Sequence, residues 1–217
     1  GIEPQTLKLF EVCRLRDVPI ITFINKIDRE GRPPFELLDE IADKLALDVS
    51  PMSWPVGMGG LFEGVYDFER RALYLPEGDS REFAGRTVKV EGPEHPQLAE
   101  YLSADGVARI VEVGQLAREG YAPFDLEAYR NGDLTPVYFG SALKQFGVEE
   151  VIEAIAEFAP PPRPQPSDRG DISPARDEVT GFIFKVQANM DPQHRDRIAF
   201  MRMVSGTFKR GMKLIPS

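Results

Sequence analysis

The sequence predicts an α/β fold with a parallel sheet, followed by a short β-rich segment. Two short apolar segments, residues 19–24 and 135–139, have the composition of strands that are buried on both faces. Segments with helical spacing flank them, and this alternation is typical of a parallel α/β sheet. Six prolines within residues 159–175 then separate this part from residues whose apolar side chains alternate as in strands.

Composition restricts the class of protein. The 217 residues carry 26 Lys and Arg against 35 Asp and Glu, and the net charge of −9 argues against a protein that binds free DNA through a basic face. One cysteine and two histidines exclude a disulfide framework and a four-cysteine zinc site, so we expect no metal site. No apolar run approaches the ~18–20 residues of a membrane helix. We therefore expect a cytoplasmic protein with no membrane partner.

The first elements follow from local patterns. Residues 4–16 carry apolar side chains at roughly helical spacing and predict a helix with Cys13 on its apolar side. The strand over residues 19–24 comes next. A second helix is predicted to open at Pro33 or Pro34, since proline suits the first helical turn. Its buried side would contain Phe35, Leu38, Ile41 and Leu45.

The middle of the chain changes character twice. Residues 47–55 suggest a strand, and the glycine-rich residues 58–60 suggest a turn. Residues 64–90 are strand-like, whereas residues 97–118 and 126–130 have helical spacing. This stretch separates the two apolar strands of the sheet.

The last part of the first domain repeats the strand-to-helix order. The strand over residues 135–139 leads to a predicted helix over residues 148–158. One face of that helix would carry Val151, Ile152, Ile155 and Phe158.

The proline cluster predicts a stiff, extended linker over residues 159–175. Strands are predicted after it at residues 179–187 and 198–204, and residues 212–217 are predicted to start another. Such a sheet has open edges and half a core. The first residue is also Gly1 rather than Met. We therefore expect an internal piece of a longer protein.

The motif with the clearest chemistry is Asn25, Lys26 and Asp28 at the carboxyl end of the first strand. Ligand sites of open α/β sheets lie at that end. An ionised Asp28 accepts two hydrogen bonds, and guanine presents two adjacent donors where adenine has none. The apolar stem of Lys26 can lie along the base, and Asn25 can either tie the loop together or bond the base. The motif alone is also consistent with an ordinary turn, because Asn and Asp favour turns.

A second loop strengthens the guanine interpretation. Ser141 and Ala142 follow the second apolar strand and precede a helix, so backbone N–H groups of this small-residue loop can approach a ligand. In guanine-nucleotide proteins such a loop donates to the guanine carbonyl oxygen. Asp28 and Ser141 are 113 residues apart, whereas one βα step needs only about 30, so we expect inserted structure in roughly residues 60–130.

Other parts of a nucleotide site have no counterpart. No G-x-x-x-x-G-K-[ST] segment is present, so the chain has no phosphate-cradling loop. We therefore expect recognition of the base without the contacts to phosphate and Mg²⁺, and no catalytic residue in this chain.

Several segments together resemble bacterial peptide chain release factor 3. The run over residues 185–202 is the most specific, and the resemblance covers essentially the whole chain. Elongation factor G has a similar sequence at residues 1–6 and the same guanine loop, but it resembles the chain less. The segments that carry the resemblance are residues 22–29, 35–41, 54–57, 139–143, 146–148 and 185–202.

The resemblance implies a P-loop-type GTPase of translation termination that binds the ribosome and uses GTP to promote dissociation of class-1 release factors. It implies residues 1–158 as the C-terminal part of the GTP-binding domain, with an insert at about 60–130. A linker over residues 159–176 and the first strands of an elongation factor Tu domain 2-like β-barrel at 177–217 would follow. Mg²⁺ would bind GTP or GDP elsewhere in the longer protein. The guanine contacts carried over are Asn25, Lys26, Asp28, Ser141 and Ala142.

Two other functions remain open. The chain is also consistent with an elongation factor G-like translocation GTPase. A non-catalytic module that only docks on the ribosome is the other alternative. For this piece alone we expect no GTPase activity, because hydrolysis needs phosphate, Mg²⁺ and transition-state contacts.

Overall fold

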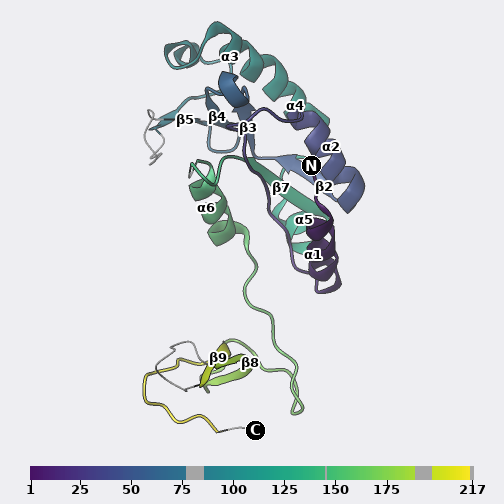
Figure 1. Cartoon of the computed structure of the whole chain (residues 1–217), viewed down its shortest axis with the longest axis vertical. Helices are drawn as coiled ribbons and strands as arrows, with labels where there is room; N and C mark the ends of the chain where they lie inside the picture. The colour runs from purple at the N-terminus through teal and green to yellow at the C-terminus, as the bar shows by residue number, and fades with distance from the viewer. Residues whose placement is uncertain (77–85, 145, 189–196, 216–217) are drawn as a thin grey trace. The chain divides into compact units, whose positions relative to one another are not determined.

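The computed structural model describes residues 1–76, 86–144, 146–188 and 197–215. The chain forms two compact units, residues 1–159 and residues 160–217, and each is described by itself (Figure 1). Within the described ranges, no helix has the length and apolar character needed to cross a membrane.

A parallel sheet of three strands organises the first unit. Its order is β1-β7-β2, so the strand that comes last in the chain lies between the other two. The predicted α/β class is confirmed. The elements of this part are α1 (Pro4–Leu15), β1 (Thr22–Ile24), α2 (Pro34–Leu45), β2 (Asp48–Pro51), α5 (Leu126–Asn131), β7 (Leu134–Phe139) and α6 (Val148–Phe158).

Both faces of this sheet are covered by helices, which explains why every residue of β7 is buried. Val137 and Phe139 share one hydrophobic cluster with Leu38 of α2. Tyr138, which points to the opposite face, packs in a second cluster with Ala154 of α6. Figure 1 shows α6 on one side of β7 and α2 on the other.

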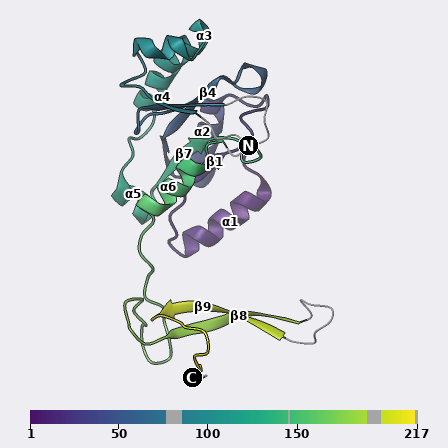
Figure 2. The same cartoon turned by 90° about the vertical axis from the view of Figure 1, so that its left-hand side faces the viewer.

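An antiparallel sheet with strand order β3-β4-β5-β6 lies between β2 and β7 in the sequence. Short helical segments follow it, and Figure 2 shows α3 and α4 at one end of the first unit and α5 further along it. Trp54 of β3 connects this sheet to the parallel sheet and its helices, since its ring centroid lies 4.8 Å from that of Phe35 in α2 and 5.6 Å from that of Phe139 in β7. The elements are β3 (Ser53–Val56), η1 (Gly59–Leu61), β4 (Gly64–Asp67), β5 (Ala72–Leu75), β6 (Arg86–Lys89), η2 (Pro96–Glu100), α3 (Ala104–Ala108), η3 (Arg109–Gly114) and α4 (Gln115–Gly120).

The single strand predicted over residues 47–55 is wrong, because the chain changes sheets within it. β2 ends at Pro51 and pairs in parallel with β7, whereas β3 begins at Ser53 and pairs antiparallel with β4. Met52 lies at the change of direction, and its N–H donates to Val137 O at 2.9 Å.

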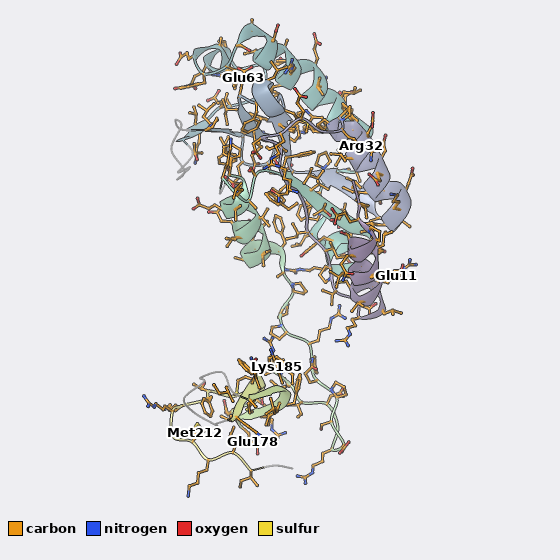
Figure 3. All side chains as sticks on the ribbon, in the orientation of Figure 1. Glu11, Arg32, Glu63, Glu178, Lys185 and Met212 are labelled. Carbon is orange, nitrogen blue, oxygen red and sulfur yellow. The ribbon has the colours of Figure 1, made fainter. Side chains whose placement is uncertain are left out.

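The helix predicted over residues 97–118 is interrupted before α3. Ser103 caps α3 by accepting a hydrogen bond from Gly106 N–H at 3.0 Å. The Glu63 carboxylate, labelled in Figure 3, accepts from both the N–H and the hydroxyl of Ser103 at 2.6 Å. A residue with this extended capping conformation cannot continue the preceding helix.

Three burial expectations also change. β1 is only half-buried, because within the described residues it lies at the edge of the sheet. Ile152 and Ile155 of α6 are exposed, since the helix packs through Ala154 and its neighbours one turn away. Cys13 is half-buried rather than part of the core.

The second unit contains the hairpin of β8 (Thr180–Ala188) and β9 (Arg197–Ser205). The predicted linker is not extended throughout, because Gln165 and Ile172 exchange two backbone hydrogen bonds around a turn. Residues 212–215 form no strand, since no described segment pairs with them, and this prediction is wrong there. Residues 189–196 of the family-specific run lie outside the described residues.

Candidate functional site

The two predicted loops lie next to each other, because the strands that precede them are neighbours. Ile24 of β1 pairs with Phe139 of β7 at the carboxyl end of the sheet. The first loop (residues 25–28) and the second loop (residues 140–144) leave the sheet at this edge. Gly140 connects them by donating to Ile24 O at 3.0 Å and accepting from Ile27 N–H at 3.2 Å.

Asn25 ties the two loops together. Its Oδ1 accepts a hydrogen bond from Lys26 N–H at 2.8 Å and one from Ala142 N–H at 2.9 Å. Lys26 has a φ of 69°, a left-handed conformation that is unfavourable for a residue with a side chain. The first of these bonds therefore helps to hold a strained turn. Of the two roles predicted for Asn25, the structure contains the loop tie.

Asp28 is oriented at this edge with only 12% of its side chain exposed. Lys144 Nζ of the second loop lies 3.9 Å from Asp28 Oδ2, so a cation faces the carboxylate. The residue before it, Ile27, is fully buried and fixes the backbone from which the carboxylate extends. A carboxylate held in this way can accept two parallel hydrogen bonds from a flat ligand.

Ser141 is buried, with 2% of its surface exposed, and its Oγ has no hydrogen-bond partner within the described part of the chain. The two backbone hydrogen bonds that Ser141 exchanges with Phe146 close the second loop. A Cβ on Gly140 would overlap Phe146 O and the ring of Phe23, so the loop requires glycine there. An orphaned buried hydroxyl is costly, which makes Ser141 Oγ a group that a bound ligand could satisfy.

The arrangement fits a planar base more than it fits a metal or a catalytic centre. Asp28 and Ser141 come from adjacent loops and supply an acceptor pair and a hydroxyl. The described residues contain no group of three or more His, Cys, Asp or Glu side chains that could hold a metal ion.

Two residues around Asp28, Lys144 and Gly59, were not predicted from the sequence to belong to the site. Lys144 was not predicted to face Asp28, because the approach depends on how the second loop folds back. Gly59 N–H donates to Ile27 O at 3.1 Å from a turn that was predicted only as a turn. Its one signal was the glycine-rich run of residues 58–60, shortly after a predicted strand.

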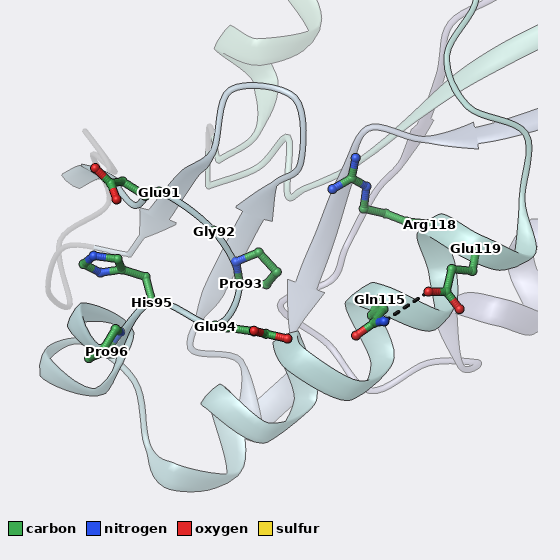
Figure 4. A pocket seen from close by; sticks show the side chains of 9 residues that line it. All are labelled: Glu91, Gly92, Pro93, Glu94, His95, Pro96, Gln115, Arg118 and Glu119. Carbon is green, nitrogen blue, oxygen red and sulfur yellow. Dashed lines mark hydrogen bonds between the residues drawn. The ribbon is translucent and has the colours of Figure 1, made fainter.

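A groove of about 760 Å³ lies apart from the two loops (Figure 4). Residues 91–96 form one wall and α4 the other, with Gln115, Arg118 and Glu119. His95 uses its Nδ1 to accept from Gln97 N–H at 3.3 Å, a capping role that begins η2. None of the predicted site residues lines this groove.

A buried carboxylate holds the turn that follows β4 in the antiparallel sheet. Asp67 is 2% exposed and accepts from Glu69 N–H at 3.0 Å and Arg70 N–H at 2.8 Å. Burial raises the pKa of Asp67 above its usual value, against the lowering effect of these hydrogen bonds. Arg70 extends to α6, where Nη1 lies 2.8 Å from Glu153 Oε2. These contacts are structural, because the carboxylate is used to hold its own turn.

Both units of the chain match known families of translation proteins. Residues 1–161 match the elongation factor Tu GTP binding domain, and residues 178–217 match elongation factor G domain 2. The structure is similar to the crystal structure of ttk003000868 from Thermus thermophilus, with a TM-score of 0.63 and 24% identity over 98% of this chain. The chain spans 31% of the length of that protein. By the match over its first 161 residues, the chain belongs to the elongation factor Tu GTP-binding domain family.

Proposed function

We propose that this chain is the guanine-recognition part of a translational GTPase. The observation that carries the proposal is the pair of adjacent loops that hold Asp28 and Ser141, whose hydroxyl has no hydrogen-bond partner among the described residues. The family match gives the same chemistry an independent basis, because its members bind guanine nucleotides through their GTP-binding domain.

Each proposed site residue has a separate task. Asp28 accepts hydrogen bonds from the ring N–H and the exocyclic amine of guanine, and Lys26 covers the base plane with its apolar stem. Ser141 faces the carbonyl edge of the base with its hydroxyl, because its N–H donates to Phe146 O, and Ala142, whose N–H donates to Asn25 Oδ1, lies beside it. Asn25 holds the two loops at a fixed separation through its bonds to Lys26 N–H and Ala142 N–H. A site of buried polar groups rejects adenine strongly, because the wrong base leaves those groups unpaired.

The proposed domain organisation places residues 1–158 in the GTP-binding domain, with an insert at about residues 60–130. A linker at residues 159–176 and the first strands of a β-barrel at 177–217 follow. GTP and Mg²⁺ would be bound in the full-length protein by phosphate contacts that these residues do not supply. The full-length protein would hydrolyse GTP, whereas this chain alone is expected to show no turnover above background.

For the biological role we propose translation termination in the cytoplasm. The full-length protein would bind the ribosome and promote release of class-1 release factors. The support is the resemblance of residues 185–202 to bacterial peptide chain release factor 3. The match of residues 178–217 to elongation factor G domain 2 favours translocation as the second candidate. A release-factor recycling assay beside a translocation assay on the full-length protein separates the two.

The base contact is tested by Asp28→Asn in the full-length protein. The amide presents a donor where guanine needs an acceptor, so the preference should shift from guanosine to xanthosine nucleotides. Asp28→Ala is the companion variant and should weaken both. Unchanged preference for GTP in Asp28→Asn would refute the proposed contact. Ribosome pelleting that survives Asp28→Ala without any nucleotide dependence would favour the non-catalytic docking module.

A further inference from the structure

The glycine turn, residues 57–61, connects β3 to β4 and packs on the backbone of the first loop. Gly59 donates its N–H to Ile27 O at 3.1 Å, and Ile27 is the residue directly before Asp28. On its other side, Ile27 N–H donates to Gly140 O at 3.2 Å. The peptide groups that carry Asp28 are therefore held from the second loop and from the glycine turn at once.

The contact leaves no space for a side chain on Gly59. A Cβ there would lie 2.9 Å from Glu30 N and 3.3 Å from Arg29 C, both backbone atoms of the segment that follows Asp28. Gly59 also has a φ of +57°, which L side chains rarely adopt. By contrast, a Cβ on the next residue, Gly60, would meet no atom of the described residues within 4 Å. Gly57 also requires glycine, because its Cβ would overlap Leu61 O inside the turn, but of the turn's glycines Gly59 is the one that bonds to the first loop.

The turn itself is fixed by the antiparallel sheet. Val56 pairs with Gly64 at the end of the β3–β4 ladder, and Glu63 N–H donates to Val56 O at 2.8 Å. Leu61 N–H closes the turn by donating to Met58 O at 3.1 Å. A rigid hairpin therefore presents Gly59 to the loop, and a displacement of the loop is the easier response to added volume.

We propose that Gly59 is a positioning residue for guanine specificity, acting through the backbone of residues 27–30 on the Asp28 carboxylate. This inference rests on the proposed function. Gly59 does not contact the base. It fixes the position of the Asp28 carboxylate at the edge of the sheet, so that both carboxylate oxygens reach the two guanine donors. Sites of this kind require placement within about 0.5 Å.

The test uses Gly59→Ala in the full-length protein, with binding of GDP and inosine diphosphate measured by calorimetry. Inosine lacks the exocyclic amine, so the ratio of the two affinities reports the bidentate contact of Asp28. We expect GDP affinity to fall about tenfold or more, and the GDP:inosine diphosphate ratio to fall with it. The ratio does not depend on the fraction of protein that is folded.

Two matched variants separate the effect of the contact with the first loop from the effects of an added methyl group and of backbone strain. Gly60→Ala adds the same methyl group to the same turn without a contact. Gly132→Ala adds it at the end of α5, where φ is +84° but the part of the chain that the structure describes has no atom within 4 Å, and so reproduces the backbone strain away from the site. Both should keep the wild-type ratio. Gly59→Asn, which tolerates left-handed backbone better, should still lower the ratio because its Cβ remains.

The outcomes are distinct. A fall of the ratio in Gly59→Ala and Gly59→Asn alone supports the inference. A ratio that stays constant in Gly59→Ala, whether or not overall affinity falls, overturns the inference while leaving the proposed function intact, provided that Asp28→Asn shifts preference to xanthosine diphosphate. If Asp28→Asn does not shift preference, the proposed function fails, and the inference fails with it.

Discussion

Replacing Asn25 with alanine removes the tie between the two loops. The side chain accepts two backbone hydrogen bonds, from Lys26 and Ala142, and both bonds lie at the exposed edge of the sheet. A hydrogen bond contributes about 0.5–1.5 kcal/mol net, and the lower half of that range applies where water competes. Two bonds therefore contribute about 1–2 kcal/mol to the local order of the loops.

Hydrogen exchange at the amide of Ala142 measures this contribution on the chain itself. A loss of about 1–2 kcal/mol corresponds to about 5–30-fold faster exchange of that amide in Asn25→Ala. The amide of Met52, which donates to Val137 O within the sheet, should keep its protection and serves as the internal reference. Circular dichroism should remain that of the wild type, because neither bond belongs to a helix or strand ladder.

Asn25→Asp is the matched variant. A carboxylate retains the acceptor for both N–H groups but loses the amide donor, so protection of Ala142 should be kept. Guanine affinity in the full-length protein would then fall only if Asn25 also donates to the base. Unchanged exchange of Ala142 in Asn25→Ala would refute the idea that the side chain ties the loops.

The remaining predictions concern the framework around the site. The hydrogen bond from Lys44 lowers the pKa of Glu40 from 4.5 to about 2. The ionised Glu40 carboxylate therefore stabilises the fold above pH 4.5, and this stabilisation is lost as the pH falls toward 2. The difference in Tm between wild type and Glu40→Gln should vanish over that range. Asp67→Ala leaves two backbone N–H groups without an acceptor and should lower the free energy of unfolding by about 1–3 kcal/mol in urea, more than Asp67→Asn does. Gly140→Ala should cost about 1–3 kcal/mol through overlap with Phe146 O and the Phe23 ring, whereas Gly120→Ala, which has no described atom within 4 Å, should cost no stability; equal costs would contradict the overlap.

Local patterns were sufficient where one pattern determined one element. The second helix was predicted to open at Pro33 or Pro34 and begins at Pro34, because proline and the apolar spacing agree there. Both loops that carry the candidate site follow apolar strands, and their position at one edge follows from parallel pairing alone. For this reason Asp28 and Ser141 could be predicted together despite their distance in sequence.

Contacts between distant segments could not be predicted in the same way. The change of sheet at Met52 depends on which strand each half pairs with, and alternation of apolar residues carries no such information. Packing likewise decided that Ile152 is exposed on α6 while Ala154 is buried. The contact of Gly59 with the first loop depends on where the β3–β4 hairpin ends. A pair of glycines signals a turn, but not what the turn touches.

The pairing of β1 with β7 has a consequence for the order of folding. Thr22 and Thr135 share a hydrogen bond across 113 residues, and Asn25 reaches Ala142 across 117. Contacts of such long sequence separation form slowly, because closing the long intervening chain loses conformational entropy before the contacts can offset that loss. The helices and the β3–β4 hairpin are local and can form first. In a refolding experiment the edge that carries Asp28 should therefore be among the last regions to become protected, so that competence for a ligand marks the completion of the unit.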